Sequence, residues 1–450
     1  MALTRATRAP HPLRPVLFAP LAVAVALTGC YEPTRTSVPG LTERYWAAAE
    51  LSAPPFESKH LTLADALARA KAHSSSVIAA KAELAARKAQ VDAAAEVENP
   101  ELRIGQLRLD QLTHDQEEVE VKLRVKPPPP LQNDALRAEA EADARYAAAD
   151  LNEAERETIA AARLAYYETA ALDRAMEATK RLAALQERRG KVLEQNATQN
   201  RATSLDLALA SVDRAKVDDD LATLAGQRRR SLGRLGDAVG LTLPEDVELD
   251  PLDFSRLAVV EVPSESALVK LGLENAPELE RRAAEIDAAA ATVDQERSTQ
   301  IPWFSFLELG YHFSPGTIDP EGFTFGAGIR LPIFDPRIGA VDAAEAQKTA
   351  LMRHFDADAS SLKGLVLDAR REVVAAQQSV GADREKLREA AKAAAREADK
   401  AMEVGQLDEL SAIKIQSDAA KLAVDDAKAV QRMLEALAEL ERLTGWKPQI

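Results

Sequence analysis

Acidic and histidine side chains could do chemistry in this chain, but their spacing matches no catalytic or metal-binding motif. His354 and Asp358 lie one helical turn apart, without a third ligand at a fixed position. The run Asp218-Asp219-Asp220 lacks the glycine and terminal glutamate of a calcium loop. The sequence carries no phosphate-binding or dinucleotide-binding glycine motif. We therefore expect no enzyme, no metal and no soluble cofactor.

Cys30 is the single cysteine, and its position predicts a covalent lipid. Three arginines and an apolar run from Val16 to Leu27 precede it, which is typical of a secretory signal and too short to span a membrane as a helix. Residues 27–30 (Leu-Thr-Gly-Cys) resemble a bacterial lipobox, so we expect cleavage before Cys30 and a diacylglycerol on its thiol. Tyr31 after the cysteine is typical of an outer-membrane address. The alternative is a chance buried cysteine.

Composition limits the class of partner and the kind of core. The net charge of -15 argues against nucleic acid, and the basic run Arg228-Arg229-Arg230 is interpreted as a solvated helix face. Aromatic residues make up only 4% of the chain, and much of its apolar content is alanine. Alanine favours long helices that pack closely, so we expect thin helical layers.

Two pairs of strands, each opened and closed by proline, interrupt the helical pattern. We expect the first pair at about 101–109 and 118–126, and the second at about 303–313 and 322–331. In residues 119–126 and 323–331 apolar and other side chains alternate, which predicts strands with one apolar face. Arg103, Arg108 and Asp110 break this alternation in the first pair. If these strands cross a membrane, the three residues must face the lumen or lie near an end, or the barrel is unusually short, because charge on a lipid face is costly. Pro127 and Pro332 mark the strand-to-helix turns.

Strands of nine or ten residues suit a tilted transmembrane β-strand. Aromatic residues of the second pair are interpreted as a girdle at the membrane interface: Trp303, Phe304, Tyr311, Phe323 and Phe325. The alternative is a small sheet that faces water. Four strands per chain cannot close a barrel, and open sheet edges are not tolerated in lipid. Transmembrane strands therefore require oligomerisation, and three chains would supply twelve strands.

Long unbroken helices are predicted over 131–197 and 338–404, each about 100 Å long at 1.5 Å per residue. Short breaks follow, and return helices are expected over 204–238 and 407–444. Shorter helical stretches, 61–98 and 264–300, precede the strands. The fold class is mainly α with a small β part, a duplicated unit of long antiparallel helical hairpins plus two strands.

The expected organisation has six parts. They are a signal peptide (1–29), a lipid-anchored extension (30–60), a first repeat (61–250), a linker (251–262), a second repeat (263–445) and a tail (446–450).

From about residue 61 to 445 the sequence resembles the TolC-like outer-membrane factor (outer membrane efflux protein) family, lipidated branch. Three motifs carry the resemblance: the helix opening from Ala267 to Leu279, the strand exit Leu-Pro-Ile-Phe at 331–334, and the hairpin from Gly405 to Leu410. The family implies a homotrimer whose twelve-stranded β-barrel in the outer membrane continues into an α-helical periplasmic tunnel. Its partners are a periplasmic adaptor (membrane fusion protein) and an inner-membrane transporter.

The resemblance places the periplasmic entrance at two hairpin tips, near Asn200 and Gly405. Acidic residues near the tips set ion preference in the family, and Asp206 matches such a position. In the second repeat, two positions where the family has acidic residues are occupied by Ser411 and Lys414. Asp408 and Glu409 are therefore candidates for an acidic ring at shifted positions. The alternative for these two is a solvated helix N-terminus.

The predicted function is an outer-membrane channel subunit of a tripartite efflux pump, a passive exit duct. Two alternatives stay open: a type I secretion exit duct, and a non-channel periplasmic helical lipoprotein with a structural or adaptor-like role.

Overall fold

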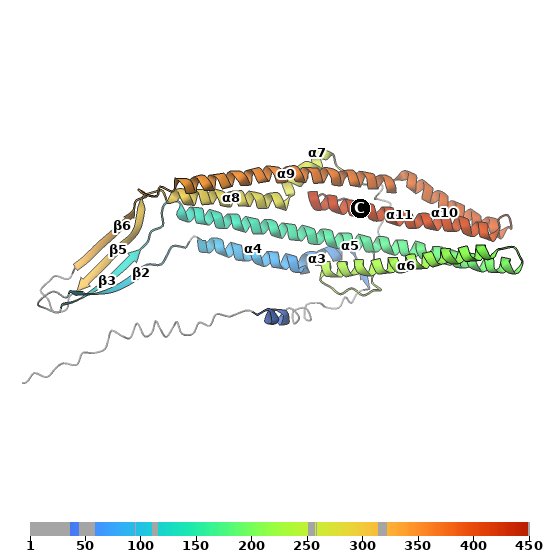
Figure 1. The fold of residues 1–450 in the computed structure, drawn as a ribbon, viewed down its shortest axis with the longest axis horizontal. Helices are drawn as coiled ribbons and strands as arrows, with labels where there is room; N and C mark the ends of the chain where they lie inside the picture. The colour runs from blue at the N-terminus through green and yellow to red at the C-terminus, as the bar shows by residue number, and fades with distance from the viewer. Residues whose placement is uncertain are drawn as a thin grey trace, which may run out of the picture. The chain divides into compact units, whose positions relative to one another are not determined.

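The computed structural model describes residues 37–44, 59–94, 96–109, 116–250, 257, 259–313 and 322–448. The chain divides into two compact units, Met1–Pro54 and Pro55–Ile450. In the first unit, residues 38–44 form a short exposed helix. The predicted signal peptide, Cys30, most of the predicted extension and Asp110 lie outside the described residues. The second unit carries the duplicated elements (Figure 1).

Each half of the second unit contains two short helices, a pair of antiparallel strands and a long helical hairpin, in that order, and the first half also carries the two-residue strands β1 and β4. The first half comprises β1 (His60–Leu61), α3 (Leu63–His73), α4 (Ser75–Ala94), β2 (Glu101–Leu109), β3 (Gln116–Val125), α5 (Gln132–Thr198), α6 (Ser204–Val239) and β4 (Glu248–Leu249). The second comprises α7 (Glu265–Asn275), α8 (Pro277–Ser298), β5 (Trp303–Phe313), β6 (Gly322–Arg330), α9 (Ile338–Val380), α10 (Ala382–Glu403) and α11 (Glu409–Thr444).

The two long helices differ in continuity. The 67-residue α5 agrees with the predicted unbroken helix of the first repeat. The prediction of an unbroken helix over 338–404 is wrong, because the backbone becomes extended at Gly381 and separates α9 from α10. The Gly381 carbonyl then accepts from the backbone N–H groups of Arg384 (3.0 Å) and Glu385 (3.1 Å) and starts α10. Glycine is about 1 kcal/mol less favourable than alanine inside a helix, so a break is easiest there.

The helical stretches before the strands are also broken once each. The break lies at Ser74 in the first repeat and at Ala276 in the second, where Pro277 begins α8. Proline has no backbone N–H and is favoured in the first turn of a helix, which explains the start of α8. Each of the predicted helical stretches, 61–98 and 264–300, therefore consists of two short helices.

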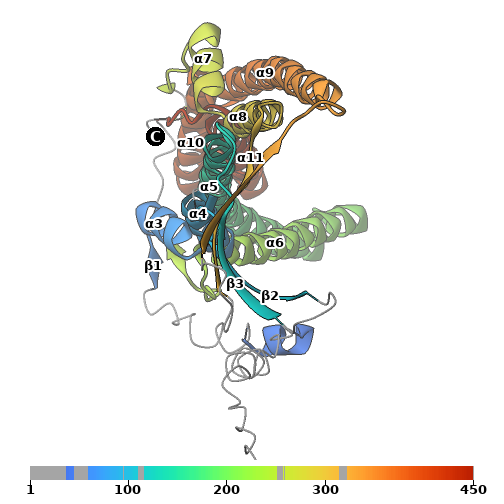
Figure 2. The same cartoon turned by 90° about the vertical axis from the view of Figure 1, so that its left-hand side faces the viewer.

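The helices pack around α5, which contacts α4, α6, α8 and α11 (Figures 1 and 2). Half of the buried residues of α5 are alanines, among them Ala162 and Ala165. Small side chains let neighbouring helices approach closely. Larger side chains fill the centre of the core, including Tyr166, Leu235 and Met433, all 0% exposed.

Tyr166 joins the helices to the small parallel sheet of β1 and β4. Its hydroxyl donates to the Leu61 carbonyl (3.0 Å) and accepts from the Asp250 backbone N–H (3.0 Å). Burial raises the pKa of Tyr166 to about 12, so the hydroxyl keeps its proton at neutral pH. The same side chain thus holds the strands that enter and leave the first repeat.

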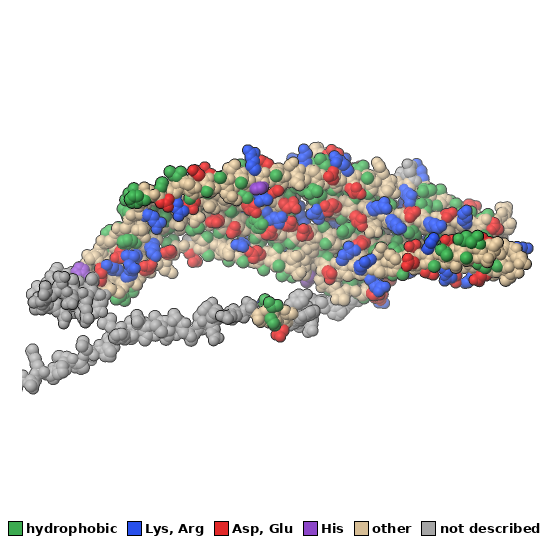
Figure 3. All heavy atoms as spheres, viewed as in Figure 1, with side chains coloured by type: hydrophobic (Ala, Val, Ile, Leu, Met, Phe, Trp, Pro, Cys, Tyr) green, Lys and Arg blue, Asp and Glu red, His purple; other side chains and the backbone are tan. Residues whose placement is uncertain are grey.

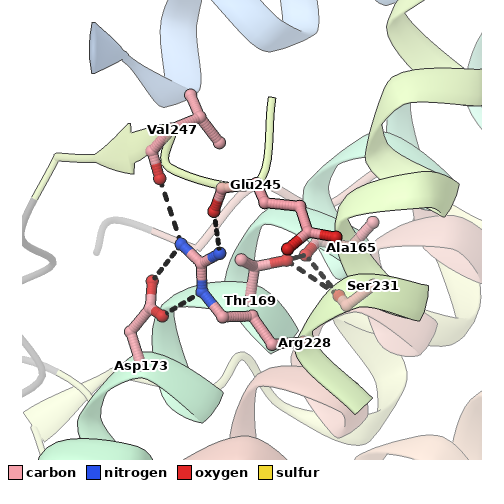
Figure 4. A network of polar contacts seen from close by, with 7 residues as sticks. All are labelled: Ala165, Thr169, Asp173, Arg228, Ser231, Glu245 and Val247. Atoms are coloured by element: carbon pink, nitrogen blue, oxygen red, sulfur yellow. Dashed lines mark hydrogen bonds and ion pairs between the residues drawn. The ribbon is translucent and has the colours of Figure 1, made fainter. Parts of the chain in front are cut away.

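Arg228 fixes the loop that leads into β4, as Figure 4 shows. Its guanidinium pairs with Asp173 of α5 and donates to the carbonyls of Glu245 (2.6 Å) and Val247 (3.0 Å). Only 16% of its side chain is exposed. The interpretation of residues 228–230 as a solvated helix face is therefore wrong for Arg228, whose partners come from α5 and from the loop before β4. Such partners are not visible in a local run of charges.

Candidate functional site

The four-stranded sheet has an apolar face built row by row from all four strands. The strand order is β2-β3-β5-β6, and every pair is antiparallel. The register places Leu102 opposite Leu123, Leu123 opposite Leu309, and Leu309 opposite Phe325. These side chains are 66%, 45%, 53% and 75% exposed. A row of large apolar side chains left exposed is a surface for a nonaqueous environment or a partner.

The next row repeats the pattern with Ile104, Val121, Tyr311 and Phe323. The rings of Tyr311 and Phe323 lie 5.1 Å apart between centroids. Ile104 is 68% exposed and Phe323 is 77% exposed. The alternation expected from the sequence therefore produces one continuous apolar face.

The opposite face carries ion pairs. Glu308 bonds Arg124 (2.8 Å) and lies 3.5 Å from the Lys122 ammonium, and only 11% of its side chain is exposed. The Arg124 guanidinium lies 4.3 Å from the centroid of the Phe306 ring, a favourable cation–π contact. The register puts Arg103 opposite Lys122 and so on this charged face. Arg103 does not break the alternation, because Leu102 and Ile104 beside it supply the apolar positions of β2. Its place on the charged face agrees with the expectation that it faces away from lipid.

The five predicted interface aromatics fall into two groups. Phe304 pairs with Ile329, so it shares the apolar face with Tyr311, Phe323 and Phe325. Trp303 pairs with Arg330 on the charged face, and its indole N–H donates to the Pro127 carbonyl (3.2 Å). A register shift between Phe304 and Phe306 separates the groups. The bulge explains why strict alternation from Trp303 onward assigns the faces incorrectly.

The strand-to-helix turns have the same backbone frame in both repeats. A proline, Pro130 or Pro336, is followed by a left-handed residue, Leu131 (φ 69°) or Arg337 (φ 56°), directly before α5 or α9. The predicted turn residues Pro127 and Pro332 lie at the start of these segments. The frame fixes the direction in which each long helix leaves the sheet.

The hairpin tips also share one turn. Asn200 (φ 57°) and Gly405 (φ 72°) adopt the left-handed conformation after α5 and α10. The next residue in each turn donates its backbone N–H to a carbonyl five residues back, over 2.8 Å. This helix-ending motif satisfies carbonyls that the helix leaves without a partner. It reverses the chain at both tips in the same way.

The two return helices begin with the same kind of cap, but the positions of the acid and the hydroxyl are reversed. In α6 the cap is Thr203, and the Asp206 carboxylate accepts from its hydroxyl (2.7 Å) and backbone N–H (2.8 Å). In α11 the cap is Asp408, which accepts from the Ser411 backbone N–H (3.0 Å) and hydroxyl (2.5 Å). The hydrogen bond from the hydroxyl is the main reason that the pKa of Asp206 and that of Asp408 lie below their ordinary values.

The remaining gate candidates lie on α11. Glu409 bonds Arg188 of α5 (2.7 Å) and so links the two hairpins near their tips. Ser411 is engaged by Asp408, and Lys414 is exposed. The sequence did not identify Arg188, because its partner lies more than two hundred residues away.

A buried charge cluster lies beside the break at Gly381. Asp426 of α11 is 3% exposed and bonds Arg384 of α10 (2.8 Å). Its other carboxylate oxygen lies 3.7 Å from Arg388, one turn further along α10. Burial, followed by the charge of Arg388, lowers the pKa of Arg174 on α5. Asp426 thus fastens α10 to α11 where α10 has lost its continuity with α9.

No group of three or more His, Cys, Asp and Glu side chains that could hold a metal lies among the described residues. Asp358, one member of the His354 pair, bonds Arg282 (3.0 Å). Across the described ranges, no helix is both long enough and apolar enough to cross a membrane.

The fold is similar to that of several solved outer-membrane channels. It is similar to the outer membrane protein VceC of Vibrio cholerae (15% identity, 85% of this chain and 96% of that chain, TM-score 0.67). It is also similar to the MtrE outer membrane channel of Neisseria gonorrhoeae (17% identity, 85% and 88%, TM-score 0.66) and the CmeC outer membrane channel of Campylobacter jejuni (12% identity, 99% and 94%, TM-score 0.64).

Residues 268–446 match the model of the family described as "Outer membrane efflux protein". Over this range the match confirms the resemblance to the family that was predicted from the sequence. Among curated proteins, none matches the sequence significantly.

Proposed function

We propose that the chain is a subunit of a passive, trimeric exit duct in the outer membrane, part of a tripartite efflux pump. Three copies of the sheet form a twelve-stranded barrel, and the helical hairpins continue it as a periplasmic tunnel. The hairpin tips dock to a periplasmic adaptor, and an inner-membrane transporter supplies the energy. A lipid on Cys30 anchors the mature N-terminus in the outer membrane.

One observation carries this proposal: the sheet has an exposed apolar row across its four strands, with Leu102 at one edge and Phe325 at the other, and a charged opposite face. In a barrel the apolar row faces lipid and the charged row faces the water-filled lumen. β2 and β6 are the outer strands of the sheet, so each has an edge left open for a strand of a neighbouring chain. A sheet that faced water on both sides would have no use for the apolar row.

Two adjacent substitutions on β6 test the proposal. Phe325→Arg places a charge on the apolar face, which costs about 2–4 kcal/mol at mid-membrane. Thr324→Arg is the matched control, because Thr324 pairs with Gly310 on the charged face. We expect Phe325→Arg to reduce the amount of oligomer assembled in the outer membrane, and Thr324→Arg to leave it near the unsubstituted level. Equal assembly of both variants would support the non-channel lipoprotein instead, since Phe325 would then face water.

A further inference from the structure

The segment that joins β6 to α9 exposes a second cluster of large apolar side chains. Phe334 is 99% exposed and Ile333 is 69% exposed. Leu331 and Ile338, at the two ends of the segment, are 57% and 59% exposed. Figure 3 shows hydrophobic side chains gathered over the sheet end of α9. We refer to residues 331–338 as the exit loop.

The exit loop is held in place by hydrogen bonds along its length. The Ile333 backbone N–H donates to the Leu331 carbonyl (2.9 Å), which turns the chain sharply. The Gln300 side chain donates to the Pro336 carbonyl (2.9 Å), and Arg337 pairs with Glu296 of α8 (2.9 Å). The exposure of Phe334 therefore belongs to a well-anchored loop.

The first repeat shows that this backbone frame does not require large apolar side chains. When the left-handed residues Leu131 and Arg337 are aligned, Pro127 and Pro128 stand where the exit loop has Ile333 and Phe334. Both prolines are half-buried. The second repeat thus carries two exposed apolar side chains that the shared turn does not need, so these side chains serve something outside the described fold.

We infer that the exit loop inserts into the periplasmic leaflet of the outer membrane and sets the depth of the sheet. The inference rests on the proposed function. The loop continues the apolar face, because Ile329 and Phe304 form its row nearest the helices. Toward α9 the charged residues Asp335 and Arg337 follow Phe334 and separate it from Ile338. An apolar surface bordered by charges is the pattern of a protein segment at the level of lipid headgroups.

Spin-label accessibility tests the inference. In a Cys30→Ser background the chain has no other thiol, so a nitroxide can be attached at Phe334→Cys in the full-length protein. The protein is reconstituted into vesicles of phosphatidylethanolamine and phosphatidylglycerol. Collision rates are then measured with oxygen, which concentrates in lipid, and with a water-soluble nickel chelate. Ile333→Cys gives a second label in the loop.

Two controls separate the inference from the proposed function. Phe325→Cys labels the apolar face, and Val404→Cys labels the exposed hairpin tip (67% exposed). We expect the oxygen-to-nickel ratio at 334 and 333 to exceed that at 404 severalfold and to approach that at 325. A high ratio at 325 with nickel access at 334 would overturn the inference alone. So would low collision rates with both reagents at 334, which would place a neighbouring chain over the loop. Nickel access at 325 would overturn the proposed function as well.

Discussion

Asp426→Asn should loosen the tip-side half of the second hairpin without unfolding the rest. Breaking a buried ion pair from one side costs about 3–5 kcal/mol, because the other charge stays buried without a partner. Asp426 is 3% exposed, and its partners Arg384 and Arg388 keep 31% and 18% of their side-chain exposure. Arg384 can regain part of its hydration, so we expect Asp426→Asn to lower the local stability of α10 and α11 by about 3 kcal/mol, the low end of this range.

The assay is hydrogen–deuterium exchange of the backbone amides of α10 and α11. A loss of about 3 kcal/mol from local opening corresponds to about 100-fold faster exchange, at about 1.4 kcal/mol per factor of ten. Asp418→Asn is the matched control on the same helix, because Asp418 is 62% exposed and pairs only loosely with Lys421 (3.8 Å). Unchanged exchange in Asp426→Asn, or the same acceleration in both variants, would refute the role assigned to the buried cluster.

Four further predictions concern the hairpin tips and the β1–β4 anchor. Neutralising Asp206 and Asp408 together, each to asparagine, should reduce cation selectivity, and an unchanged reversal potential in a salt gradient would show that they do not line the lumen. Because the pKa of both groups is lowered in the folded chain, selectivity and capping should persist from pH 7 to 5 and weaken only as acid reaches the lowered values. Glu409→Gln removes the 2.7 Å ion pair with Arg188 and should lengthen the open times in single-channel records. The melting temperature should not change, since exposed ion pairs contribute only about 0–1 kcal/mol to stability. Shorter open times would contradict a role of this ion pair in holding the tips together. Tyr166→Phe removes two buried hydrogen bonds and should destabilise the β1–β4 region by about 1–3 kcal/mol, seen as faster amide exchange there; unchanged exchange would contradict this.

Local patterns in the sequence predicted the parts of the fold that depend on local physics. The alternation over residues 119–126 predicted a two-faced strand, because side chains of a strand point alternately to opposite sides. The proline-bounded repeats predicted the order of strands and helices. Only the description of Arg103 as a break in the alternation was wrong, because the register with β3 places Arg103 opposite Lys122 on the charged face.

Features that depend on distant partners were not predictable from sequence. A single glycine such as Gly381 occurs inside many continuous helices, so its type alone does not predict a break. The bond between Asp426 and Arg384 joins residues 42 positions apart. At the tips, the exchange of acid and hydroxyl became visible only when Thr203 and Asp408 were placed as caps. Sequence comparison alone presents Ser411 as a missing acid.

Conductance in planar bilayers shows whether copies of this chain form a pore. The full-length protein is purified in detergent, its oligomeric state is measured, and it is added to the bilayer. We expect a trimer that produces discrete conductance steps. A monomer that inserts without pore events would contradict this expectation.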